Sequence, residues 1–178
     1  MRAFSGASLA LAAVLTLTSA TGCTYVGRMN AARAFKAANQ AYVQQDYVTA
    51  AQRYEEAISE YPDLVQAHFF LANSYDQQYR STRRGEAEND QLLGRAVEHY
   101  QICADALVTS EEPADRKLGM LSLQYLAAVY APDKLNDPAR AEPVIHRMIE
   151  IEPCQGPFVA SGAHEHPHGI APREELAH

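Results

Sequence analysis

The chain has 178 residues, of which 47% are hydrophobic and 21% are charged, and its formal net charge is −7. This length is enough for one domain with a core plus short appendages, and the composition is that of a globular rather than a disordered protein. An acidic chain repels phosphate backbones, so we expect no nucleic-acid binding. The three cysteines form no C-x-x-C pair, which disfavours zinc-ribbon and thioredoxin-type chemistry.

The first 22 residues have the pattern of an export signal. A short basic start, Met1-Arg2, precedes an almost wholly apolar run at residues 7–17. That run is shorter than the roughly 20 apolar residues of a membrane-spanning helix. It therefore favours the hydrophobic region of a secretory signal, which is removed in the mature protein.

The signal ends in Ser19-Ala20-Thr21-Gly22-Cys23, which resembles the end of a bacterial lipoprotein signal. The resemblance implies that residues 1–22 are removed, that Cys23 is lipidated, and that residues 23–29 form a lipid-anchored linker. Thr24, rather than Asp, follows the cysteine, and this implies sorting to the outer membrane, facing the periplasm. The alternatives are an ordinary cleaved signal or an uncleaved anchor.

An internal repeat follows the linker. The motif Leu-Ala-x-x-Tyr begins at Leu71 and again at Leu126, and a weaker copy surrounds Ala38. Each copy precedes a second pattern, in which an Ala is followed by a larger side chain and then, in the first two copies, by a small one. Ala72 lies 34 residues after Ala38. A small residue beside a large ring suits two helices that pack closely, so the pattern predicts helical hairpins.

These residue types and the 34-residue spacing resemble the tetratricopeptide repeat. The resemblance implies an all-α fold, an α-α superhelix of about three helix pairs, with an N-terminal signal segment and a disordered C-terminal tail. The repeat domain is expected at residues 30–153, with repeats at about 31–63, 64–109 and 115–153. By register with the family, the residues that pack the repeats are Ala38, Ala50, Tyr54, Ala57, Pro62, Leu71, Ala72, Tyr75, Ala96, Tyr100, Leu126, Ala127, Tyr130, Ala141 and Pro153.

The pattern predicts six helices in three antiparallel pairs. They are expected at residues 30–45 with 47–61, 64–80 with 90–108, and 115–131 with 138–151. Asp63 is a candidate N-cap for the third helix, and Asn89 or Asp90 for the fourth. Asp137 followed by Pro138 predicts the start of the sixth. The polar insert within residues 76–94 is expected to be a loop.

In the tetratricopeptide family the first helices of the pairs line a concave groove that binds a protein or peptide. The resemblance therefore implies a non-catalytic protein-binding scaffold in the cell envelope. Asn39 and Asn73 occupy the same register, where they either hydrogen-bond an extended peptide or only solvate the surface. Recognition of chaperone tails needs a Lys where this chain has Phe35, so it is disfavoured. The full set of expected groove residues is Phe35, Asn39, Tyr42, Phe69, Asn73 and Gln77.

The segment 154–178 does not continue the repeat, and we expect it to be flexible. It contains His164, His166 and His168, which either belong to a solvated tail or bind a divalent metal such as zinc, copper or nickel. A metal-binding or sensing lipoprotein is thus an alternative function, although no metal site or cofactor is predicted. Cys103 is either a buried inert thiol or the disulfide partner of Cys154.

Nothing in the sequence indicates an enzyme. It contains no G-x-S-x-G, H-E-x-x-H, P-loop or G-x-G-x-x-G motif. The histidines at positions 68, 99 and 146 lie on three predicted helices without a shared spacing, so each is expected to be a surface or core residue. An accessory subunit of an envelope enzyme is a further alternative. The basic residues Arg80, Arg83 and Arg84 form either a solvated loop or a contact for an acidic partner.

The apolar residues of the last predicted helix are spread around it, so some of them remain exposed whichever side packs on the preceding helix. Repeat arrays normally end in a helix with a polar outer face. Either a partner or a second copy of the chain covers this side, which would be self-association, or the chain is shorter than its relatives. The side chains concerned are Val144, Ile145, Met148, Ile149 and Ile151.

Overall fold

The structure is a computed structural model that describes residues 7–152, with side chains from Tyr25 onward. The described residues contain six α-helices, one short 3₁₀ helix and no strand, which confirms the predicted all-α class. The helices are α1 (Ala7–Val43), α2 (Tyr47–Glu60), α3 (Val65–Gln78), η1 (Ser81–Arg83), α4 (Ala87–Leu107), α5 (Pro113–Val129) and α6 (Pro138–Ile151).

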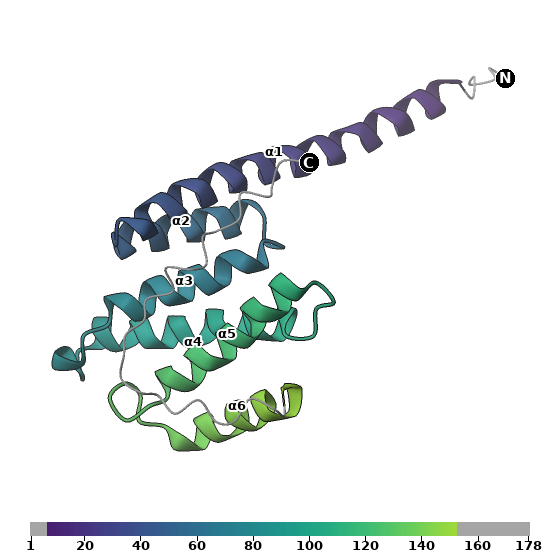
Figure 1. The fold of residues 1–178 in the computed structure, drawn as a ribbon. Helices are drawn as coiled ribbons and strands as arrows, with labels where there is room; N and C mark the ends of the chain where they lie inside the picture. The colour runs from purple at the N-terminus through teal and green to yellow at the C-terminus, as the bar shows by residue number, and fades with distance from the viewer. Residues whose placement is uncertain (1–6, 153–178) are drawn as a thin grey trace.

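The six α-helices follow one another through a single stack (Figure 1). Each helix contacts the next, and α3 also contacts α5. The part of α1 that precedes the stack projects beyond the other helices (Figure 1). Because α1 runs without interruption from Ala7 to Val43, residues 23–29, for which we expected a linker, are helical. No described helix combines the length and apolar character that a bilayer crossing requires.

Two of the hairpin turns are defined by local backbone chemistry. After α1, Gln45 adopts φ 62°, and the Asp46 amide returns to the Ala41 carbonyl at 3.0 Å. The Asp46 side chain then caps α2 by accepting a hydrogen bond from the Thr49 amide at 3.1 Å. Asp137 caps α6 in the same way, with Pro138 directly after it, which confirms the predicted start of that helix.

Two predicted caps are wrong. The residue before α3 is Leu64, and no side chain caps that helix, so Asp63 does not serve as its N-cap. Helix α4 begins at Ala87, before either of the predicted capping residues. The Asn89 side chain instead binds the preceding loop, where it accepts from the Arg80 amide at 2.9 Å and donates to two carbonyls. The insert is therefore a short loop at residues 79–86 plus an extended α4.

Aromatic rings of the first two hairpins form the centre of the core. Tyr54 and Phe70 stack with ring centroids 5.8 Å apart, and Phe35 meets both of them edge-on. The small side chains of Ala38 and Ala50 are fully buried beside them. Burial of one large apolar side chain contributes roughly 1.5–3 kcal/mol, so this cluster is a main source of stability.

Most residues expected to pack the repeats are buried, as the register required. They are Ala38, Ala50, Tyr54, Ala57, Leu71, Ala72, Tyr75, Ala96, Tyr100, Leu126 and Tyr130. Ala127 on α5 and Ala141 on α6 are only half-buried, and Ala141 borders the open outer side of α6. Pro62 is exposed in the turn after α2, where it follows the end of the helix, and Pro153 lies outside the described residues.

Candidate partner-binding surface

Side chains from the first helix of every hairpin meet on one side of the stack. The phenol of Tyr42 in α1, the carboxylate of Asp76 in α3 and the phenol of Tyr125 in α5 lie close enough to affect one another's charge state. With three neighbours they form a group that we call the tyrosine–aspartate cluster. Its members are Tyr42, Asn73, Asp76, Tyr100, Tyr125 and Lys134.

Asn73 is the hydrogen-bonding centre of this cluster. The Tyr42 hydroxyl donates to Asn73 Oδ1 at 2.7 Å, and Asn73 Nδ2 donates to the Tyr100 hydroxyl oxygen at 3.2 Å. Burial, reinforced by the negative charge of Asp76, raises the pKa of the Tyr100 phenol well above its usual value, and burial also raises that of Tyr42. Both phenols are therefore neutral and act as hydrogen-bonding groups rather than as bases.

Asp76 is paired with a cation from another part of the chain. Lys134, in the turn between α5 and α6, donates to both carboxylate oxygens of Asp76 at 2.6 and 2.8 Å. The Asp76 side chain is only 5% exposed and that of Lys134 is 23% exposed. An ion pair with so little water around it holds the third hairpin against the second with a defined geometry.

The structure separates the predicted groove residues into two groups. Phe35, Phe69 and Asn73 are buried, because neighbouring rings and α2 or α4 cover them. For these three side chains the prediction of a ligand-lining position is therefore wrong. Asn39, Tyr42 and Gln77 are half-exposed. Asp76, Tyr125 and Lys134 were not predicted as site residues.

A register signal points to one of these three residues. Asp76 lies 34 residues after Tyr42, so the repeat spacing assigns the two to the same position in successive hairpins. Tyr125 precedes Leu126 as Phe70 precedes Leu71, so the register assigns it to the position of a core residue and not to that of Tyr42 and Asp76. Lys134 lies in a turn outside the repeat pattern, and no sequence signal marks it.

The two asparagines at matching positions make matching contacts. Asn39 Oδ1 accepts a hydrogen bond from the Tyr54 hydroxyl at 2.7 Å, across the first hairpin. Asn73 binds Tyr100 across the second hairpin, and Tyr100 occupies the register of Tyr54. Their amides are thus engaged by phenols of the same chain. In the third hairpin Ala128 occupies the corresponding position and cannot form this bond.

A second polar group lies between α3 and α4. The Nδ1 atoms of His68 and His99 are 2.9 Å apart, and the His99 ring stacks on Tyr75. Tyr75 donates to a Glu55 carboxylate oxygen, and Arg95 lies over the same ring at 5.4 Å. Two histidines that the sequence left ungrouped are therefore paired. Among the described residues, no three His, Cys, Asp or Glu side chains gather as metal ligands would.

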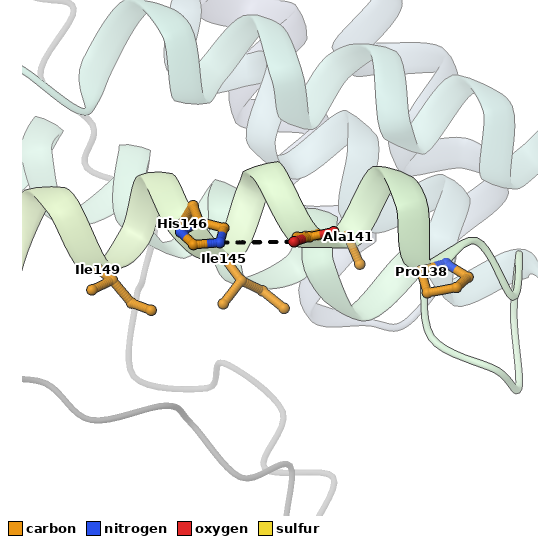
Figure 2. Close-up of a pocket in the computed structure, with 6 residues that line it drawn as sticks. Pro138, Ala141, Ile145, His146 and Ile149 are labelled. Atoms are coloured by element: carbon orange, nitrogen blue, oxygen red, sulfur yellow. Dashed lines mark ion pairs between the residues drawn. The ribbon is translucent and has the colours of Figure 1, made fainter.

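The outer side of α6 is partly apolar. The Ile145 and Ile149 side chains are 41% and 44% exposed, and they point to one side of the helix, away from the rest of the stack (Figure 2). They line a shallow, open hollow together with Pro138, Ala141, Glu142 and His146. The opposite side, with Val144, Met148 and Ile151, packs against the core. The expected exposure of this helix is thus confined to the two isoleucines.

The remaining candidate residues have structural partners. Arg84 donates to backbone carbonyls of Pro132 and Lys134, so the basic loop is tied to the turn between α5 and α6. Arg83 pairs with Glu86. Cys103 is a buried free thiol whose pKa burial raises to about 11, which makes it unreactive. Cys154, His164, His166 and His168 lie outside the described residues, as does the predicted flexible tail.

Comparison with known proteins found no family model, no curated protein and no solved structure that matches this chain. The structure itself defines the class as an all-α protein built from stacked helical hairpins.

Proposed function

We propose that this protein is a non-catalytic, protein-binding scaffold of the tetratricopeptide type in the bacterial cell envelope. Lipidated Cys23 tethers it to the outer membrane on the periplasmic side. Its hairpins form an α-α superhelix, and the partner is a protein or peptide that binds along the first helices. The repeated Asn–Tyr contacts of the first two hairpins support this assignment, because an asparagine of the first helix meets a tyrosine of the second helix at matching register in both, with the donor reversed between them.

The tyrosine–aspartate cluster carries the proposal. Its half-exposed phenols, Tyr42 from the first hairpin and Tyr125 from the third, converge beside Asp76 of the second. A tyrosine offers a rigid apolar ring with a polar tip, which suits protein interfaces and explains its enrichment there. Partner contacts at this position would reach all three hairpins at once. Because the phenols are neutral and the Lys134 amine is paired with the Asp76 carboxylate, the arrangement supports binding.

The first test concerns the anchor. Intact mass and membrane partition are measured for the chain expressed in a bacterium, beside the variant Cys23→Ser. We expect the unmodified sequence to begin at a triacylated Cys23 and to sediment with membranes, and only the variant to lose the acyl chains. An unmodified Cys23 in a soluble protein would refute the lipoprotein assignment.

The second test concerns the binding surface. Envelope proteins crosslinked to the chain are compared between the unaltered protein and the variant Tyr125→Phe, which removes a hydroxyl that makes no hydrogen bond in the described residues. The control is Val48→Ser, at a side chain that is 54% exposed on α2 and outside the cluster. We expect one partner to be recovered with the unaltered chain and the control, and to be reduced with Tyr125→Phe. Equal recovery from all three would contradict a role for the cluster.

A further inference from the structure

Helix α1 differs in charge from the rest of the chain. All 22 acidic residues lie at Asp46 or beyond, although the chain as a whole has a net charge of −7. The charged residues of α1 are Arg28, Arg33 and Lys36, all of them basic. This one helix is therefore a positively charged edge on an acidic molecule.

The outer side of α1 is exposed and mixes these basic groups with apolar ones. Tyr25 is 68% exposed, Val26 55% and Met29 40%. Tyr25, Met29, Arg33 and Lys36 follow one another at i, i+4, i+8 and i+11, so they lie along one stripe of the helix. The opposite stripe contains the buried side chains that pack on α2, among them Ala31, Ala34 and Ala38. We call the exposed set the α1 outer face: Tyr25, Val26, Met29, Arg33 and Lys36.

The beginning of this face is held firmly against α2. At Gly27 the two helices approach so closely that a Cβ would lie 2.7 Å from the Glu60 carbonyl oxygen. The Asn30 amide donates to a Glu60 carboxylate oxygen at 3.2 Å, and the Arg28 guanidinium lies 5.3 Å from the centre of the Tyr61 ring. These contacts fix the direction of α1 within a few residues of Cys23. The α1 outer face therefore has one orientation relative to the whole stack.

We propose that the α1 outer face lies on an anionic phospholipid surface. Exposed apolar and aromatic side chains flanked by basic ones are the pattern of helices that lie in the membrane interface. Each basic side chain near an anionic surface strengthens binding roughly fivefold, and the acidic remainder of the molecule is repelled by the same surface. The combination of basic and apolar groups thus fits an anionic lipid interface, and it turns α1 toward the membrane and α6 away from it.

The proposed contact with lipid rests on the proposed function in one respect, because a lipidated Cys23 would bring the α1 outer face to the membrane. The test below does not depend on that lipid anchor. The chain from position 23 onward with Cys23→Ser, which lacks the apolar run at residues 7–17 and cannot be acylated, is mixed with vesicles of phosphatidylcholine alone or with about one third phosphatidylglycerol. The vesicles also contain a lipid with a photoreactive headgroup, and the crosslinked residues are mapped by mass spectrometry. The variant Arg33→Glu/Lys36→Glu is compared with Arg116→Glu/Lys117→Glu on α5, an exposed pair that changes the net charge equally.

We expect the headgroup crosslinks to fall between Tyr25 and Lys36. We also expect the Arg33→Glu/Lys36→Glu variant to lose these crosslinks on phosphatidylglycerol vesicles by more than about tenfold, while the α5 variant retains them. Circular dichroism verifies that both variants are folded. Crosslinks concentrated elsewhere, or equal losses in both variants, would overturn the proposal. Because acylation plays no part, a failed anchor and a failed lipid face give different results.

Discussion

The Nδ1 atoms of His68 in α3 and His99 in α4 lie 2.9 Å apart, and the centres of the two rings are 5.0 Å apart. At this distance one Nδ1 donates its proton to the other, so one neutral ring carries its N–H at Nδ1 and the other carries its N–H at Nε2. Burial, together with the charge of His99, lowers the pKa of His68 to about 4, and burial also lowers the pKa of His99. Both rings are therefore neutral near pH 7.

This pair makes stability depend on pH. Below its ordinary pKa of 6.5, His68 binds a proton in the unfolded chain, whereas in the folded chain it does so only near pH 4. The unfolded state then binds more protons, so the free energy of unfolding falls as the pH drops from 6.5 towards 4. We expect the free energy of unfolding to be lower by on the order of 3 kcal/mol at pH 4 than at pH 7. Urea unfolding at pH 7, 6, 5 and 4 measures it.

The control for this prediction is the variant His68→Gln/His99→Gln. It retains His146 and the C-terminal histidines, so any remaining slope between pH 7 and 4 belongs to other groups. We expect the variant to show a clearly shallower decline than the unaltered chain. Parallel curves for the two proteins would exclude the histidine pair as the source of the pH dependence.

The helices could be located from the sequence because small and large apolar residues recur at helical spacing. Five of the six helices begin and end within about three residues of their expected positions, and this accuracy follows from the periodicity itself. The loop after α3 was harder to predict. Asn89 has the residue type of an N-cap, but its side chain binds the loop carbonyls, and only the folded loop shows this competition.

The candidate site was only partly predictable for a related reason. Register identifies which residues occupy matching positions, and Asn39 and Asn73 do make matching contacts. Register does not say how deeply a neighbouring helix covers a side chain, so Phe69 and Asn73 were expected at a groove and are buried. Contacts such as His68 with His99 depend on the crossing of two helices, which no local spacing encodes.

Gly119 marks the closest approach of α5 to the preceding turn. A Cβ at this position would lie 2.4 Å from the Val108 amide nitrogen and 2.7 Å from the Leu107 carbonyl carbon. Because both are backbone atoms, Gly119→Ala must push α5 away from the end of α4. We expect this change to lower the free energy of unfolding by about 1–3 kcal/mol. The control Gly94→Ala, in open space on α4, is expected to stabilise by about 0.5–1 kcal/mol. Thermal unfolding measures the change in stability of both variants, which should fall for Gly119→Ala and rise for Gly94→Ala. A change in the same direction for both would contradict the close packing at Gly119.

The ion pair between Lys134 and Asp76 should matter far more than the ion pairs on the surface. Lys134→Met removes the cation from a carboxylate that is only 5% exposed, and we expect a loss of roughly 3 kcal/mol in the free energy of unfolding. Arg53→Met breaks the pair with Glu56, in which both side chains are 51% exposed, and should change stability by less than about 0.5 kcal/mol. Chemical denaturation measures both, and similar losses would show that Asp76 does not depend on Lys134.

The matched asparagines give the last comparison. Asn73→Ala removes the acceptor of the Tyr42 hydroxyl and the donor to the hydroxyl of the buried Tyr100, so it leaves two phenols without their partner. Because Tyr100 has no access to water, we expect a loss of about 2–4 kcal/mol. Asn39→Ala releases only one hydroxyl, that of the equally buried Tyr54, and should cost less, about 1–2 kcal/mol. If urea unfolding shows the Asn39 variant to be equally or more destabilised, Asn73 is not the hydrogen-bonding centre of the cluster.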